Sequence, residues 1–359
     1  MQGKVKTISF HGQNIYIGID AHQKNWTVTV LTENSLLKTF SQDPDCGILH
    51  TYLQRTFPGG NYYSAYEAGF CGFSIHRNLV EYGIKNIVVN PADIPTTDKE
   101  RKQKEDRRDS RKIARSLKNQ ELTGIHVPNK ETEELRSLIR YRKTLVKEIS
   151  RHKSRIKSHL YCFGITVPVS MAQASTYWSG KFTDWIKTVE QSTVYGDMVL
   201  RGTLETVKHL RDELLKINRK LRELEKVGPY CLAIRLLRSI PGIGLIVAVT
   251  LLSELDSIKR FKSLDRLCSF VGLVPRTNSS GEKDKTGRIT PRSNRPLRGV
   301  IVEAAWIASR NDPALALCYL NLCKRMKPNE AIIRIAKKLL NRVRYVMKNE
   351  EEYAHSVVQ

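Results

Sequence analysis

Alternating apolar and polar positions dominate the first ninety residues of the chain. The runs NIYIGID (14–20) and WTVTVLT (26–32) are rich in β-branched and aromatic residues, which is typical of strands. The same reasoning predicts strands at 35–41, 61–67 and 86–90, with helices of three- and four-residue apolar spacing at 47–56 and 74–82. This order, followed by a further helix, predicts an α/β fold in which helices cover a mixed sheet.

From about residue 131 the apolar spacing becomes helical. Apolar residues recur at three-, four- and seven-residue steps through 131–160, and a second apolar stripe runs through 204–224. Two long amphipathic helices around an irregular segment at 163–200 predict a helical hairpin, an ordinary bundle or an intermolecular coiled coil. The pattern does not decide between these arrangements.

The last third is again helical and begins with a tight turn. SIPGIG (239–244) is followed by the apolar helix pattern LIVAVTLLSEL. Such a turn either presents backbone N–H groups to a phosphate or only joins two helices. We therefore expect three parts: an α/β domain at 1–125, a helical hairpin or coiled-coil region at 126–227, and a mainly α domain at 228–359.

The charge of the chain points to a polyanionic partner. Its 60 Lys and Arg against 36 Asp and Glu give a formal net charge of +24, which favours binding to phosphates. A ribosomal or chromatin-type binder without chemistry would show the same excess.

The sequence has no apolar run of membrane-spanning length and no apolar signal core at its start, so we expect a cytoplasmic protein without a membrane partner. Seven scattered cysteines without a C-x-x-C pair predict reduced thiols.

Four acidic residues stand where phosphodiester chemistry would need them. Asp20 and Glu67 end the first and fourth strands, whose ends meet at one edge of a sheet. Asp106 and Asp109 lie three apart in the helical pattern KEDRRDSRKIA and share a face. Four gathered carboxylates require cations, and two Mg²⁺ ions, for which Mn²⁺ can substitute, would serve phosphodiester cleavage. Alternatively, Asp106 and Asp109 only pair with arginines, because 99–118 holds ten Lys or Arg.

Both halves of the chain resemble one known family. YIGIDAHQKNWTVTV, YEAGFCG, VVNP and KEDRRDSRKIA resemble the RuvC-like domain of the DEDD insertion-sequence transposases, which include Piv-type DNA invertases and bridge-RNA-guided recombinases. SIPGIGLIVAVTLLSEL, RFKSLDRLCSFVGLVPRTNSSGEK and GRITPRSNRPLRGVIVEAAW resemble the C-terminal domain of that family. The resemblance covers nearly the whole chain. It implies an RNase H-like (RuvC-like) front domain in which the four acids are catalytic metal ligands.

The family's C-terminal serine falls on Ser280, which directly precedes a glycine, whereas the adjacent Ser279 does not. A serine hydroxyl is a weak nucleophile without a base or a metal. All nine histidines lie outside 228–354, so we expect activation by the metals of the front domain, within one subunit or between two. The alternative is that Ser280 only forms a turn in a polar loop. One departure is Ser110, where the family commonly has alanine, and a small polar residue should be tolerated there.

Cations outnumber acids around Ser280 and are expected to hold the scissile phosphate. These candidate DNA-binding residues are Arg276, Lys283, Lys285, Arg288, Arg292, Arg295 and Arg298. The resemblance implies a DNA recombinase that acts on donor and target duplexes, is guided by a structured RNA and works as a homo-oligomer, a dimer or a tetramer. Basic runs at 99–118 and 136–159 would suit an RNA backbone. A metal-only nuclease that hydrolyses with water and a non-enzymatic nucleic-acid binder are the alternatives.

Overall fold

The computed structural model describes residues 9–95, 106–173, 175–280 and 283–354, except for the side chains of 277–280, 283–286 and 288. The chain forms two compact units, Met1–Val127 and Pro128–Gln359. The helical region expected at 126–227 falls in the second unit together with the C-terminal helices. Its separation as a domain of its own stays a prediction.

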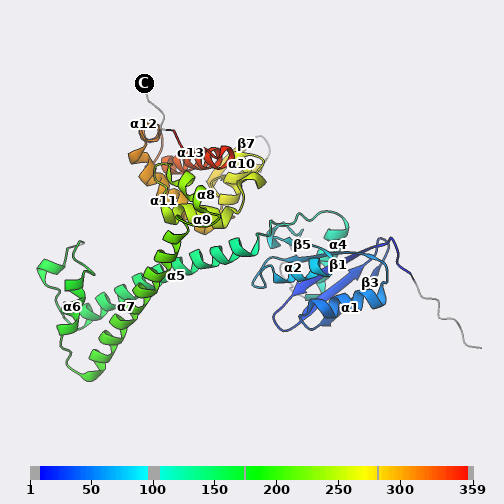
Figure 1. The fold of residues 1–359 in the computed structure, drawn as a ribbon, viewed down its shortest axis with the longest axis horizontal. Helices are drawn as coiled ribbons and strands as arrows, with labels where there is room; N and C mark the ends of the chain where they lie inside the picture. Colours follow the sequence, from blue (N-terminus) through cyan, green and yellow to red (C-terminus); the bar gives the residue numbers. More distant parts are fainter. Residues whose placement is uncertain (1–8, 96–105, 174, 281–282, 355–359) are drawn as a thin grey trace, which may run out of the picture. The chain divides into compact units, whose positions relative to one another are not determined.

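The N-terminal unit is built on a five-stranded mixed sheet (Figure 1). Strand order is β3-β2-β1-β4-β5; β1 is antiparallel to β2 and parallel to β4. Its elements are β1 (Asn14–Ala21), β2 (Trp26–Leu31), β3 (Leu36–Gln42), α1 (Cys46–Thr56), β4 (Asn61–Glu67), α2 (Ser74–Glu81), β5 (Lys85–Val89) and α4 (Asp106–Lys118). The predicted α/β order is confirmed, and the boundaries of the five strands and of the helices predicted at 47–56 and 74–82 lie within one residue of the observed ones.

The two faces of β1 have different neighbours because its side chains alternate. Ile15, Ile17 and Ile19 are fully buried in one core with residues of α1 and α2. The opposite face, which carries Gly18, lies against α4. The sheet therefore has helices on both faces, and the intervening side chains of β1 point toward α4.

The C-terminal unit begins with a long helical hairpin. Helix α5 (Lys130–Cys162) lies beside α7 (Val194–Glu223) in the same chain, and α6 (Gly180–Thr188) lies at the far end of the pair (Figure 1). There Phe182 is fully buried among aromatic side chains in a small separate core. Of the three arrangements that the apolar pattern left open, the structure shows the hairpin within one chain.

The remaining helices enclose the largest core of the protein. They are α8 (Cys231–Arg238), α9 (Leu245–Leu255), α10 (Leu264–Val271), α11 (Arg295–Asn311), α12 (Pro313–Cys323) and α13 (Pro328–Asn349). The first half of α5 and the end of α7 contribute to the same core. A predominantly helical C-terminus is therefore confirmed.

One carboxylate is buried in this helical core. Glu254 of α9 is 1% exposed and accepts hydrogen bonds from Arg140 of α5, Nε to Oε1 at 2.9 Å and Nη2 to Oε2 at 3.0 Å. The Asn294 side chain donates to Oε2 at 2.8 Å and also caps α11 by accepting from the backbone N–H of Leu297. Arg136 Nε lies 3.6 Å from Oε2. Glu254 therefore joins the hairpin helix α5 to the start of α11.

Two local structures differ from the sequence predictions. Helix α7 begins at Val194, ten residues before the predicted start, although its first turns contain Gly196 and Gly202, which disfavour a helix. The loop at 275–289 forms an antiparallel hairpin of β6 (Pro275–Ser280) and β7 (Lys283–Ile289). Its polar sequence has no apolar alternation that would have predicted strands.

The SIPGIG turn connects α8 to α9 and lies tightly against α11. Gly242 has φ +88°, and a Cβ there would come within 2.5 Å of the backbone oxygen of Ala304. This close contact supports the interpretation that the turn joins two helices.

Among the described residues, no helix is both long and apolar enough to cross a membrane. All seven cysteines are free.

Candidate active site

Close contact between β1 and α4 creates the candidate site. A Cβ on Gly18 would lie 2.1 Å from the backbone oxygen of Ser110 and 2.5 Å from the backbone nitrogen of Ala114. Only glycine allows the helix backbone to approach the strand this closely. Asp20 lies two residues beyond Gly18 on the same face, and Asp106 lies one turn before Ser110 on α4. The packing at Gly18 therefore brings the two carboxylates together.

Buried hydroxyl groups fix the same helix against β2. Ser110 is fully buried, and its Oγ lies 2.8 Å from Oγ1 of Thr29, which in turn lies 3.0 Å from Oγ1 of Thr39 on β3. The Arg111 Nε donates to the same Thr39 hydroxyl at 3.1 Å. Ser110, a departure from the family pattern, therefore has a hydrogen-bonding partner in the sheet that an alanine would lack.

A Ser110→Ala variant is expected to lose about 1 kcal/mol of unfolding free energy. Its hydrogen bonds with Thr29 and to the carbonyl of Arg107 disappear, while Thr29 keeps its bond to Thr39. Urea unfolding of Ser110→Ala, Thr29→Val and the double variant measures the coupling between the two hydroxyls. Additive effects of the two substitutions would contradict a role for this pair in holding α4.

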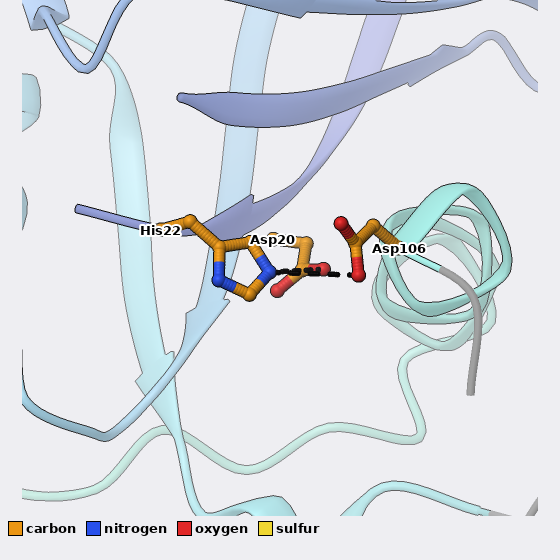
Figure 2. Close-up of side chains that lie close together, drawn as sticks. All are labelled: Asp20, His22 and Asp106. Carbon is orange, nitrogen blue, oxygen red and sulfur yellow. Dashed lines mark hydrogen bonds and ion pairs between the residues drawn. The ribbon is translucent and has the colours of Figure 1, made fainter. Parts of the chain in front are cut away.

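Asp20, Asp106 and His22 form the centre of the site (Figure 2). His22 Nε2 lies 3.2 Å from Oδ2 of Asp20 and 3.6 Å from Oδ1 of Asp106. One ligand atom from each residue can be chosen so that all three lie within 4.8 Å of one another. Figure 2 shows one nitrogen of the imidazole directed toward both carboxylates, with Asp106 reaching in from the helix.

The electrostatics of this cluster favour a bound cation. Burial raises the pKa of Asp20 above its ordinary value; His22 acts in the opposite direction, and Asp106 and Asp109 raise the pKa further. A raised carboxyl pKa means that the ionised form is disfavoured in the folded protein. A divalent cation would relieve both the desolvation and the repulsion, so the residues present fit a metal site.

Glu67 and Asp109 occupy the same region of the N-terminal unit. Strands β1 and β4 are parallel with Gly18 beside Ala65, so two residues further on Asp20 and Glu67 occupy neighbouring positions on the α4 face. Asp109 lies one turn after Asp106, and its Oδ1 is 3.7 Å from Lys112 Nζ. The structure thus places all four acids at one edge of the sheet or on the helix above it, and a three-residue cluster includes Asp20 and Asp106.

Sequence reasoning missed His22. The residue follows Asp20 by two positions, so strand alternation continued past Ala21 would have placed both side chains on one face. Its position in the loop between β1 and β2 is set by the backbone N–H of His22, which donates to the carbonyl of Asn25 at 3.1 Å. The signal was therefore in the sequence, as a potential ligand at i+2 from a strand-end carboxylate.

Ser280 is the last residue of β6 in the C-terminal unit. The backbone register of the β6–β7 hairpin pairs Ser280 with Lys283 and Asn278 with Lys285. The side chains of Ser279, Ser280, Lys283, Lys285 and Arg288 lie outside the described part of the structure. The assignment of Ser280 as nucleophile stays a prediction.

The remaining predicted DNA-binding residues lie in this hairpin or follow it. Arg276 of β6 is exposed, as are Arg292 and Arg295 beyond the end of β7. Arg298 instead donates through Nη1 to the carbonyl of Thr290 at 2.7 Å, and so holds the end of the hairpin against α11. Arg276, Arg292 and Arg295 are thus placed where solvent or a ligand can reach them, and Arg298 holds the hairpin against α11.

Comparisons with known proteins give the same result for both units. Residues 17–163 match the DEDD-type IS110 transposase model, described as "Transposase", and residues 234–320 match the model described as "Transposase IS116/IS110/IS902 family". "Putative transposase y4qE" of Sinorhizobium fredii is 29% identical over 73% of this chain and 62% of its own length. "Putative transposase y4rJ" of the same organism is 27% identical over 91% of this chain and 90% of its own.

A relative from a different bacterium agrees. The "Transposase for insertion sequence element IS1533" of Leptospira borgpetersenii is 23% identical over 82% of this chain and 85% of its own length. The chain therefore spans most of the length of y4rJ and of the IS1533 transposase, and a little less than two thirds of the length of y4qE. The acidic cluster of the N-terminal unit lies inside the matched range 17–163.

Proposed function

Because the chain belongs to the IS110/IS116/IS902 family of insertion-sequence transposases, we propose that it cleaves and rejoins DNA with a metal site in its N-terminal unit and a serine nucleophile in its C-terminal unit. The observation that carries the proposal is the meeting of Asp20 and Asp106 across the contact of β1 with α4. The mixed sheet with helices on both faces supports an RNase H-like fold for the N-terminal unit.

The four acids share one task in this proposal, which is to bind the metal. They would hold Mg²⁺, for which Mn²⁺ can substitute, at the edge of the sheet. These residues are Asp20, Glu67, Asp106 and Asp109. The bound ions would supply Lewis-acid stabilisation of charge on the phosphate. Burial and the carboxylates of Asp106 and Asp109 raise the pKa of Asp20 and so disfavour its charge, His22 acts in the opposite direction, and a bound cation would favour the charged form. The contact of Gly18 with α4 keeps the strand and helix carboxylates within reach of a common ion.

Ser280 would carry the covalent step. Its hydroxyl attacks the DNA phosphorus, a P–O bond to the DNA breaks, and a P–O bond to serine replaces it, so the linkage energy is retained without ATP. Attack by the hydroxyl of the exchanged strand then reverses the step and restores the DNA linkage. Because 228–354 contains no histidine, the serine proton must leave to another acceptor. The basic residues around the β6–β7 hairpin would hold the phosphate during both steps.

The proposed partners are donor and target duplexes, a structured guide RNA and further copies of the chain. The net charge of +24 supports a nucleic-acid partner of either kind. Joining two DNA segments requires two cleaved sites to be held together, which supports a homo-oligomer.

Trapping of covalent protein–DNA adducts tests the proposal. The full chain is expressed together with the DNA that flanks its coding sequence and incubated with labelled duplexes of that DNA and Mg²⁺; adducts are resolved on denaturing gels. Wild type and the matched control Ser279→Ala are expected to form the adduct, whereas Ser280→Ala and Asp20→Asn are expected to lose at least about 100-fold of it. Circular dichroism verifies that each variant is folded.

Two results would overturn parts of this proposal. Cleavage without an adduct, unchanged in Ser280→Ala but lost in Asp20→Asn, would indicate a metal nuclease that uses water. DNA binding without any cleavage, unchanged by Asp20→Asn, would indicate a non-enzymatic nucleic-acid binder.

A further inference from the structure

We propose that His22 is a nitrogen ligand of the metal site and makes this site bind Mn²⁺ in preference to Mg²⁺. The inference rests on the proposed function, because it concerns the same metal centre, but it adds a ligand outside the four acids. It follows from the position of one imidazole nitrogen between the strand carboxylate of Asp20 and the helix carboxylate of Asp106.

The distances match those between atoms that share one ion. Ligands about 2.1 Å from an octahedral cation lie about 3 Å apart when they are adjacent in the coordination shell. His22 Nε2 is 3.2 Å from Asp20 Oδ2 and 3.6 Å from Asp106 Oδ1. A small convergence of the three side chains would thus surround a cation, and no backbone element would need to move.

The backbone holds His22 in this position. Ala21 pairs with Trp26 at the end of the β1–β2 ladder, and the N–H of His22 donates to the carbonyl of Asn25, so the turn begins at the residue itself. The imidazole side chain is 37% exposed, whereas the Asp20 side chain is 18% exposed. An ion at this position would therefore contact a rigid strand residue and remain accessible to a phosphate from solvent.

Imidazole changes the metal preference of an otherwise all-oxygen site. Mg²⁺ strongly prefers oxygen ligands, whereas first-row transition metals, with Mn²⁺ as the most oxygen-tolerant, accept imidazole nitrogen. A site of carboxylates plus His22 would bind both ions, with the nitrogen bond contributing mainly to Mn²⁺. The competing interpretation is that His22 only forms an ion pair with the two carboxylates, which a metal would have to displace.

These two roles predict opposite effects of removing the imidazole. If His22 is a ligand, His22→Gln weakens Mn²⁺ binding by about 10-fold to 100-fold, a loss typical of groups that support metal sites. Mg²⁺ binding changes by no more than about 3-fold, because the amide of glutamine offers an oxygen that Mg²⁺ accepts. If His22 is only a counterion, its removal leaves the binding of both ions unchanged or makes it tighter.

The experiment uses the full chain without DNA. Free Mn²⁺ is titrated by its electron paramagnetic resonance signal, and Mg²⁺ affinity is measured by competition with Mn²⁺. Electron spin-echo modulation at bound Mn²⁺ detects a directly coordinated ¹⁴N nucleus. When the protein is labelled with ¹⁵N-histidine, the ¹⁴N modulation should be replaced by that of ¹⁵N. The proteins are wild type, His22→Gln, His22→Ala, Asp20→Asn and the matched control His11→Gln, whose histidine is exposed in the same unit.

The expected result is a nitrogen signal in wild type and His11→Gln that is absent in both His22 variants, with the selective loss of Mn²⁺ affinity. A wild type without the nitrogen signal, or His22 variants with undiminished Mn²⁺ affinity, would overturn the role of His22. The Asp20→Asn variant distinguishes a wrong ligand role for His22 from a wrong metal centre. If Mn²⁺ binding is unchanged in Asp20→Asn, the proposed metal centre is wrong; if binding is lost there but kept in His22→Gln, only the ligand role of His22 is wrong.

Discussion

Gly18→Ala is expected to lower the free energy of unfolding by about 3 kcal/mol and to reduce DNA strand cleavage about 100-fold. The new methyl group would lie 2.1 Å from the Ser110 backbone oxygen and 2.5 Å from the Ala114 backbone nitrogen. Both atoms belong to a helix backbone, so no side-chain rotation relieves the overlap. Helix α4 must move away from β1 by roughly 1 Å, which strains the packing of the sheet.

The functional loss has the same cause as the loss of stability. Asp106 lies on the displaced helix and Asp20 on the strand, so their carboxylates separate when α4 moves. Misplacement of a catalytic group by about 1 Å costs on the order of 100-fold in rate. The metal affinity of the proposed site should fall in parallel, because an ion there could no longer contact both elements at ideal distances.

Denaturant unfolding and cleavage of labelled duplexes by the purified variant measure the two effects, and Mn²⁺ titration measures the metal affinity. The matched control is Gly202→Ala in the interior of α7, where a Cβ would meet nothing within 4 Å. That substitution should stabilise the protein by about 0.5–1 kcal/mol, since alanine loses less entropy than glycine on helix formation. A Gly18→Ala protein as stable and as active as wild type would show that α4 does not depend on this contact.

The second large effect is expected for Glu254→Ala, which should cost about 3 kcal/mol of unfolding free energy. Removing one member of a buried ion pair typically costs 3–5 kcal/mol, because the partner charge is left uncompensated. The lower end applies here, because the Arg140 side chain is 54% exposed and can turn to water, whereas Arg136 is 15% exposed and cannot do so as easily. Asn294 also loses an acceptor at the start of α11.

Thermal and urea unfolding of Glu254→Ala, Glu254→Gln and Glu205→Ala test this expectation. Glutamine retains an acceptor oxygen and should lose less stability than alanine. Glu205 pairs with Lys208 at 3.7 Å on the surface of α7, so its removal should leave the unfolding midpoint near that of wild type. Equal stability of Glu254→Ala and Glu205→Ala would contradict an energetic role for the buried carboxylate.

Local patterns were sufficient for most of the N-terminal fold. In β1 the isoleucines at 15, 17 and 19 alternate with smaller or polar residues, and this period identifies a strand with two different faces without any knowledge of its partners. The strand-end positions of Asp20 and Glu67 and the shared helix face of Asp106 and Asp109 are equally local. Hence the acidic residues could be named, and their order along the chain interpreted, from the sequence alone.

Contacts between distant segments could not be predicted in this way. The buried carboxylate of Glu254 is hydrogen-bonded to Arg140, which is 114 positions away in the chain. Glycine is required at position 18 only because the backbone of α4 packs directly against it. The β6–β7 hairpin was missed because its polar sequence has no apolar alternation, and the first turns of α7 were missed because they contain Gly196 and Gly202, which disfavour a helix.

The sequence by itself determined the strand and helix order of the N-terminal unit, the presence of two long helices and the identity of the candidate acids, because hydrophobic periodicity and residue type are local properties. Only the tertiary structure decided that α4 contacts β1 at Gly18, that His22 joins Asp20 and Asp106, and that Arg298 and Glu254 have structural contacts. The physical reason is that each of these depends on side-chain or backbone atoms far apart in the chain, whose distances are set by packing and not by spacing along the sequence.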